Sequence, residues 1–158
     1  MNFVENEQDS DLIEDLKTKN QFLTEIGSRV NDIIENAGPL AGVYTGLHYT
    51  LTNNNLVVSC DVPLINTETL ILLTEQIEDK IDVIQLESMG KTMPLIALYK
   101  KQCKDICYAL LQNGERRLRI ALNHMKVKTI TLDKNQAKYT ININTPDNLK
   151  EIADEIKH

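Results

Sequence analysis

Helix-like and strand-like stretches alternate along this chain, and this alternation restricts the possible folds more than any other feature. From Leu40 onward, apolar residues recur every three or four positions, which is typical of an amphipathic helix. The asparagines 53–55 end that stretch, and the continuous apolar run Leu56 to Cys60 predicts a buried strand. Repeated alternation places helices on both faces of a sheet. The pattern therefore predicts a three-layer α/β sandwich with a mostly parallel sheet and room for one antiparallel strand.

Periodicity and capping residues locate the other elements. In the first half we expect a helix over 10–18, a helix over 40–51 with Thr45 on its polar face, a helix capped by Asn66 with Leu70, Leu73 and Ile77 facing the core, and strands over 82–86 and 94–99 paired antiparallel. In the second half we expect a helix over 102–112 closed by Asn113 and Gly114, a helix over 116–123, a strand over 127–132, a polar turn over 133–138, a strand over 139–143, and a helix capped by Thr145 with Leu149, Ile152 and Ile156 on its apolar stripe.

Composition limits the class of protein. The 158 residues are 42% hydrophobic and 25% charged, which predicts one domain over 1–158 with a core of its own. The net charge of -6 disfavours a partner that is a nucleic acid, because phosphate backbones require a basic face. No apolar run reaches the length of a membrane span, and the acidic start, Met1 to Leu12, does not resemble a signal peptide. We therefore expect a cytoplasmic protein without a membrane partner.

The three cysteines, Cys60, Cys103 and Cys107, lie within apolar patterns. Their odd number and their neighbours predict reduced core residues and argue against a disulfide framework. Cys103 and Cys107 share one helix face, which leaves a metal site as an alternative, but no histidine lies near them in the sequence. The structural interpretation is favoured.

Asp61 is the leading candidate for chemistry. It follows the predicted strand that ends at Cys60, and Pro63 restricts the turn after it. In an open α/β sheet, ligands bind outside the carboxyl ends of the strands, where a carboxylate can hold Mg²⁺ together with substrate oxygens. An aspartate at this position can equally be a solvated turn residue, and the sequence leaves both interpretations open.

A second candidate is the turn formed by Gly38, Pro39, Leu40, Ala41 and Gly42. Two glycines next to a helix start let a phosphate or a flat ring approach unpaired backbone N–H groups. Glycine and proline also commonly precede helices for structural reasons alone, so this short turn does not distinguish a ligand-binding role from a structural one.

Two further groups are candidates for binding an anionic substrate. Arg116 and Arg117 follow Gly114 and Glu115, and a planar guanidinium on Arg117 suits phosphate. Asn142 and Asn144 would face the same side of the strand predicted over 139–143. The alternatives are a pair of solvated arginines and turn-forming asparagines at a strand end.

Six segments occur along the chain in a definite order: Asp32, Gly38-Pro39-Leu40-Ala41-Gly42, Cys60-Asp61-Val62-Pro63, Pro94-Leu95-Ile96-Ala97-Leu98-Tyr99, Gly114-Glu115-Arg116-Arg117-Leu118 and Asn142-Ile143-Asn144-Thr145-Pro146. In this order they resemble the molybdenum cofactor guanylyltransferases, from about Lys19 to the C-terminus. The last segment is the most specific, because the related cytidylyltransferases tend to carry acidic residues there.

The resemblance implies a Rossmann-like nucleotidyltransferase fold and the transfer of GMP from GTP to the terminal phosphate of the molybdopterin-bound molybdenum cofactor, with release of pyrophosphate. By its motifs, Gly38 to Gly42 would line the guanine pocket, Asp32 would help to recognise the nucleotide, and Asp61 would bind Mg²⁺. Arg117, Asn142 and Asn144 would face the molybdenum cofactor. Molybdoenzymes and other cofactor-biosynthesis proteins would be candidate partners.

The family also carries a first strand and a Gly-rich loop that cradles the GTP phosphates, and the 158-residue sequence contains no such segment. The resemblance therefore predicts an incomplete nucleotidyltransferase-like domain and weak GTP binding by this polypeptide. The alternative is a non-catalytic relative that binds molybdopterin or a partner protein through the side of Asn142 and Asn144.

Overall fold

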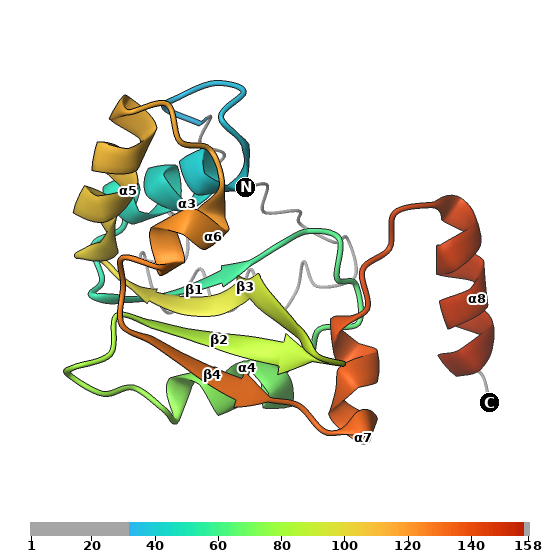
Figure 1. The fold of residues 1–158 in the computed structure, drawn as a ribbon. Coiled ribbons are helices and arrows are strands. Elements are labelled where there is room, and N and C mark those ends of the chain that lie inside the picture. The colour runs from blue at the N-terminus through green and yellow to red at the C-terminus, as the bar shows by residue number, and fades with distance from the viewer. Residues whose placement is uncertain (1–31, 157–158) are drawn as a thin grey trace, which may run out of the picture.

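The computed structural model describes residues 32–156, in which helices and strands alternate (Figure 1). In chain order the elements are α3 (Gly38–Tyr49), β1 (Asn54–Val58), α4 (Thr67–Thr74), β2 (Val83–Ser88), β3 (Lys91–Lys100), α5 (Cys103–Gln112), α6 (Leu118–Leu122), β4 (Val127–Thr131), α7 (Lys134–Ala137), the 3₁₀ helix η2 (Lys138–Thr140) and α8 (Pro146–Ile156). The helix predicted over 10–18 lies outside the described residues. Among the helices of residues 32–156, none combines the length and the apolar character needed to cross a membrane.

The four strands form one sheet in the order β1-β3-β2-β4. Strand β3 is antiparallel to both β1 and β2, whereas β2 and β4 are parallel. Three strands of this sheet therefore run in one direction and β3 runs against them, as the alternating pattern predicted. Because β1, β2 and β4 share a direction, their carboxyl ends meet at one edge of the sheet (Figure 1).

The two faces of the sheet bury two separate sets of side chains. Successive residues of a strand alternate between faces, so Val83 and Tyr99 belong to one core and Ile84 and Leu98 to the other. Helices α3, α5 and α6 cover the first core, and α4 contributes Leu73 to the second (Figure 1). The arrangement confirms the predicted three layers of helix, sheet and helix.

Several local sequence signals act as expected. The Asn66 side chain accepts a hydrogen bond from the backbone N–H of Thr69 at 2.9 Å and so caps α4. Gly114 ends α5 in the left-handed region, with φ of +80°. Met89 and Gly90 form the tight turn of the antiparallel hairpin β2-β3, with φ of 52° and 76°. Thr145 accepts a hydrogen bond from the backbone N–H of Asn148 at 3.3 Å.

The prediction for residues 133–143 was wrong. The expected polar turn is helix α7, because Asp133 and Gln136 form a capping box that satisfies the first N–H groups. The expected strand over 139–143 is instead the end of η2 followed by extended chain without sheet pairing. Asn142 and Asn144 therefore do not lie on a strand.

Some residues predicted to lie in the core are exposed, because their elements end earlier than the apolar spacing suggested. Helix α3 ends at Tyr49, which leaves Leu51 75% exposed. Ile77 lies beyond the end of α4, and Cys60 beyond the end of β1, and both are exposed. Conversely, Thr45 is buried, and the hydrogen bond that its hydroxyl accepts from the backbone N–H of Ile33 offsets the cost of burying it.

The stripe predicted for α8 is only partly buried. Ile152 is buried, but Leu149 is 53% exposed. Cys103 and Cys107, in contrast, are buried and unbridged, as expected for reduced core cysteines.

Candidate functional site

Asp61 lies just beyond the carboxyl end of β1, where the sequence predicted it. Its carboxylate accepts a hydrogen bond from the hydroxyl of Ser59, and the residue is half-buried. Its main-chain carbonyl accepts a hydrogen bond from the backbone N–H of Ile143 at 2.7 Å. This bond joins the end of β1 to a segment that is distant in the sequence.

The Asp61–Ile143 hydrogen bond brings three predicted site residues together. Asn142 and Asn144 flank Ile143 directly, and both are exposed. The chain segments that carry one carboxylate and two amides therefore meet at the edge where β1, β2 and β4 end. This is the usual ligand position of an open α/β sheet.

The segment 141–144 is anchored at its start as well. Thr140 is 3% exposed, and its hydroxyl is hydrogen-bonded to the hydroxyl of Ser88 at 3.0 Å and to the carbonyl of Ala137 at 2.8 Å. Ser88 is the last residue of β2. The segment is thus tied to β2 through Thr140 and to the end of β1 through Ile143, which fixes its position relative to Asp61.

The turn at Gly38 forms the start of α3. Gly38 has φ of +68°, and both Gly38 and Pro39 are exposed. Leu40 and Ala41 are completely buried in the core, main chain included, so the accessible part of this turn is Gly38 and Pro39. The N-cap residue Ala37 makes no capping hydrogen bond with its side chain. Of the first N–H groups of α3, that of Gly38 belongs to an exposed residue and can bind water or an anionic group.

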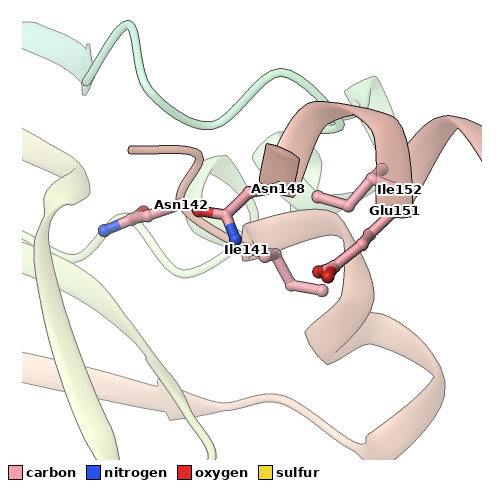
Figure 2. A pocket seen from close by; sticks show the side chains of 5 residues that line it. All are labelled: Ile141, Asn142, Asn148, Glu151 and Ile152. Carbon is pink, nitrogen blue, oxygen red and sulfur yellow. The ribbon is translucent and has the colours of Figure 1, made fainter. Parts of the chain in front are cut away.

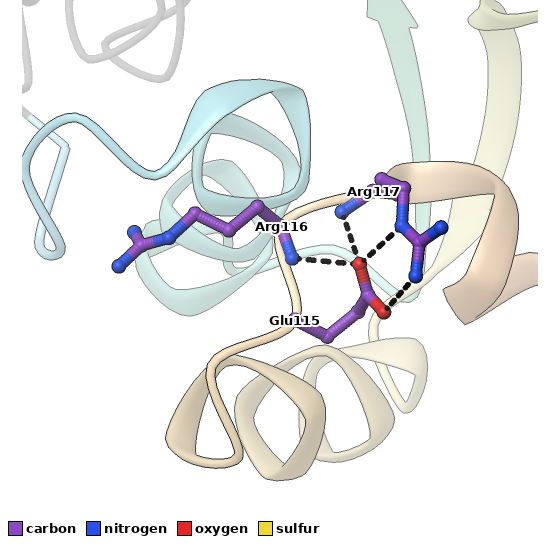
Figure 3. Close-up of polar contacts among 3 residues, drawn as sticks. All are labelled: Glu115, Arg116 and Arg117. Atoms are coloured by element: carbon purple, nitrogen blue, oxygen red, sulfur yellow. Dashed lines mark hydrogen bonds and ion pairs between the residues drawn. The ribbon is translucent and has the colours of Figure 1, made fainter.

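The Arg117 guanidinium is held by its neighbour Glu115 (Figure 3). Nε of Arg117 donates to Oε1 of Glu115 and Nη2 donates to Oε2, each at 2.9 Å. The backbone N–H groups of Arg116 and Arg117 also donate to Oε1. These contacts, with the Arg117 guanidinium as the largest contributor, lower the pKa of Glu115 from its ordinary 4.5 to about 2.

The Glu115–Arg117 loop is a neighbour of the Gly38 turn. A Cβ atom at Gly38 would lie 3.6 Å from the carbonyl oxygen of Arg116. Asp32 belongs to the same region, because the next residue, Ile33, is hydrogen-bonded to α3 through Thr45. Within residues 32–156, no hydrogen bond or ion pair links Arg117 to Asp61. The predicted residues thus form two groups, one at the start of α3 and one at the end of β1.

A hollow of about 220 Å³ lies beside the second group, between the segment 141–144 and α8 (Figure 2). The residues that line it are Ile141, Asn142, Asn148, Glu151 and Ile152. Sequence reasoning identified only Asn142 among them. It also missed Ser59 and Glu115, which hold Asp61 and Arg117. The one available signal was proximity in sequence, since each lies two residues before its partner.

The protein offers few ligands for a metal ion at this edge of the sheet. No cluster of three or more histidine, cysteine or acidic side chains that could hold a metal occurs within the described part of the chain. A site made entirely by the protein is therefore not provided by residues 32–156. Mg²⁺, however, commonly uses only one or two carboxylates together with water and substrate phosphates. Asp61 at an open sheet edge fits that smaller requirement.

The fold is that of a known class of α/β protein. A solved structure of molybdopterin-guanine dinucleotide biosynthesis protein A from Archaeoglobus fulgidus superimposes with a TM-score of 0.71, at 21% identity, over 94% of this chain and 75% of that one. A protein from Aquifex aeolicus, described as a putative protein, superimposes with a TM-score of 0.66 at 19% identity, over 90% of this chain and 88% of that one. At such identities the likeness establishes the fold.

Sequence comparison defines the family. The model for the MobA-like NTP transferase domain matches residues 17–127, and this chain belongs to that family. It is 30% identical over 124 residues to a probable molybdenum cofactor guanylyltransferase of Flavobacterium johnsoniae, covering 78% of this chain and 65% of the relative. Proteins of the same description from Bacillus mycoides and Clostridium perfringens are 34% and 33% identical over 68% and 77% of this chain. The chain spans 55% to 65% of the length of these three relatives.

Proposed function

We propose that this chain acts as a nucleotidyltransferase that moves GMP from GTP onto molybdopterin and releases pyrophosphate. The proposal is supported by membership of the MobA-like family and by relatives described as probable molybdenum cofactor guanylyltransferases. The observation that carries it is the hydrogen bond from the backbone N–H of Ile143 to the main-chain carbonyl of Asp61, because it brings the segment with Asn142 and Asn144 to the end of β1, at the ligand edge of the sheet.

The reaction needs no nucleophile from the protein. A phosphate oxygen of the acceptor attacks the α-phosphorus of GTP, a new P–O bond forms, and the bond to the β-phosphate breaks so that pyrophosphate leaves. Such a transfer between two anions depends on alignment and on neutralising charge. The chain's task is therefore to hold two phosphates together against their repulsion.

Asp61 is the residue that we assign to Mg²⁺. When bound, Mg²⁺ would lower the repulsion between the phosphates and stabilise charge on the leaving pyrophosphate. The bond from Ser59 fixes the orientation of the Asp61 carboxylate through one oxygen, Oδ1. Oδ2 is not engaged in any hydrogen bond with residues 32–156, so it is available to a cation.

The nucleotide would lie at the start of α3. The backbone N–H group of Gly38 has the polarity to bind a phosphate oxygen, and the exposed Gly38 and Pro39 leave room for a flat base. Arg117 uses Nε and Nη2 to bind Glu115 and keeps Nη1 for a phosphate. Its side chain is 74% exposed, which gives a substrate access to it.

Asn142 and Asn144 would hold the acceptor. Both amides can donate to and accept from the polar edges of a pterin, and both are accessible. The N–H of Ile143, between them, donates to the main-chain carbonyl of Asp61, so the acceptor's phosphate would reach the metal while its ring contacts the amides.

Pyrophosphate release with molybdopterin as acceptor tests the proposal. Because the sequence predicts weak GTP binding, we expect slow release that requires Mg²⁺ and GTP and that CTP does not support. Asp61→Asn should abolish release without lowering the melting temperature, because it removes a metal ligand and leaves the core intact. Asp79→Asn is the matched control. It changes an exposed carboxylate in the connection between α4 and β2 and should leave release unchanged.

Three results would contradict this function. Pyrophosphate release from CTP in place of GTP would refute GTP as the donor nucleotide. Unchanged release by Asp61→Asn would refute Asp61 as the metal ligand. Binding of molybdopterin without any release of pyrophosphate would favour a non-catalytic relative instead.

A further inference from the structure

The stretch from Asn36 to Cys60 contains no lysine, arginine, aspartate or glutamate, although these residues make up 25% of the chain. It forms α3, the turn 50–53 and β1. Three of its large apolar side chains, those of Tyr49, Leu51 and Leu56, are exposed. A solvated surface normally carries interspersed charges, whereas the cores of protein interfaces are depleted of charge and enriched in tyrosine. This uncharged stretch is therefore a candidate interaction surface.

Strand β1, which belongs to this stretch, lies at one edge of the four-stranded sheet (Figure 1). The backbone N–H of Ser59 donates to the carbonyl of Leu95, so the odd-numbered residues of this segment direct their main-chain groups toward β3. The even-numbered residues, Leu56 and Val58 among them, direct theirs away from the sheet. Within residues 32–156, no strand pairs with this side of β1.

The two edges of the sheet differ in how they are protected. Strand β4, at the opposite edge, contains Lys128 and directly follows Lys126. Charged side chains, lysine above all, keep an edge strand from pairing with other strands, and proline or a β-bulge has the same effect. Strand β1 has no charge, no proline and no shift in its register with β3, and Leu56 at its centre is 39% exposed. The edge of β1 is therefore open to another strand.

A second copy of this chain fits the open edge for two reasons. First, Leu56 is the central residue of β1 and directs its main-chain groups outward. A twofold axis at Leu56 therefore pairs the whole strand with itself, with Asn54 of each copy opposite Val58 of the other, and each opposed pair exchanges two N–H···O bonds. Second, two chains of net charge -6 repel each other, and the uncharged stretch lets them meet without placing like charges opposite one another.

We propose that two copies of this chain form a homodimer by antiparallel pairing of their β1 edges around Leu56. The two sheets then become one continuous sheet, and the two Leu56 side chains contact each other on the same face. The carboxyl end of β1 in each copy lies against the start of β1 in the other. This inference concerns an interaction surface and does not depend on the proposed transfer of GMP.

Analytical ultracentrifugation of the full 158-residue chain over a range of concentrations tests the dimer. We expect a reversible equilibrium between monomer and dimer in the wild type. Leu56→Lys places two ammonium groups opposite each other and should raise the dissociation constant about tenfold or more. Ile71→Lys is the matched control, because Ile71 is 44% exposed but lies on α4, and this variant should dimerise as the wild type does. Circular dichroism of both variants checks that they fold.

Oxidative cross-linking tests the register itself. Residues that exchange both hydrogen bonds in an antiparallel pair have Cα atoms about 5.5 Å apart, which a disulfide can bridge. Leu56→Cys, made in a Cys60→Ser background to remove the exposed native thiol, should therefore give a disulfide-linked dimer on mild oxidation. Ile71→Cys in the same background should remain largely uncross-linked under these conditions.

Salt separates this edge from a charged interface. Raising the salt concentration should not weaken the dimer, because no ion pair forms across β1 and the net charges of the two chains are screened. Four results would overturn the inference: a wild-type chain that is monomeric at every concentration, a dimer that Leu56→Lys leaves intact, a dimer that salt dissociates, or cross-linking that is equal at Leu56→Cys and Ile71→Cys.

Discussion

Thr140→Val should reveal how firmly the segment that carries Asn142 and Asn144 is anchored. Valine has nearly the shape of threonine but lacks the hydroxyl. In the native protein that hydroxyl is hydrogen-bonded to Ser88 at 3.0 Å and to the carbonyl of Ala137 at 2.8 Å. A hydroxyl has one proton and a carbonyl only accepts, so both bonds coexist when Ser88 donates to Thr140.

The magnitude follows from burial of these groups. Thr140 is 3% exposed and Ser88 is 9% exposed, so water cannot readily replace the lost partner. Each buried hydrogen bond contributes about 1 kcal/mol net, and an unpaired partner adds to the loss. We therefore expect Thr140→Val to lower the free energy of unfolding by about 2 kcal/mol. Ser88→Ala removes only one of the two bonds and should cost about half of that.

Urea denaturation of the variants measures this effect, with an unchanged dependence on urea as the sign of an intact two-state transition. Thr131→Val is the matched control: its hydroxyl donates to Glu87 at 3.1 Å, but the contact is exposed. The free energy of unfolding of this control should lie within about 0.5 kcal/mol of the wild-type value. If Thr140→Val also lies within that range, the segment is not held by Thr140 and its position must depend on other contacts.

Two further predictions concern titration and reactivity. Arg117→Ala should raise the pKa of Glu115 from about 2 toward its ordinary 4.5, and NMR titration of the carboxyl group measures this shift. Because the native pKa is lowered, the pair stabilises the fold above about pH 4.5 and loses that effect as the pH falls toward 2. A pKa that stays near 2 in the variant would contradict the assigned cause. Burial raises the pKa of the Cys103 thiol to about 11 and that of the Cys107 thiol to about 12. At pH 8 a thiol reagent should therefore modify only the exposed Cys60 in the native protein, and all three cysteines after unfolding. Rapid modification of two or three thiols in the native protein would refute the buried placement.

Much of the central fold was predictable from short-range patterns. The hairpin of β2 and β3, the cap at Asn66 and the end of α5 at Gly114 each depend on residues within a few positions of one another. The errors at 133–143 arose because an apolar, β-branched run reads as a strand whether or not it finds a partner strand. There, the capping box of Asp133 directs the chain into a helix first.

The candidate site was predictable only in part, for a similar reason. Asp61, Asn142 and Asn144 stood out by residue type and neighbouring motif, but the conclusion that the asparagines share a strand face was wrong. Their proximity to Asp61 comes instead from the bond between Ile143 and Asp61, which joins segments far apart in sequence. Glu151 gave no sequence signal, because a glutamate on an amphipathic helix is ordinary until the hollow beside it is seen.

By itself, the sequence determined the class of fold, because alternating helical and strand periodicities leave a sheet covered on both faces as the way to bury the apolar side chains. It also placed Asp61 after β1, since a polar residue follows where a buried strand ends. Tertiary structure alone decided that the segment with Asn142 and Asn144 meets the end of β1 at Asp61, and that Thr140 is hydrogen-bonded to Ser88. These outcomes depend on hydrogen bonds between chain segments whose meeting is set by packing of the whole sheet, and no local pattern encodes them.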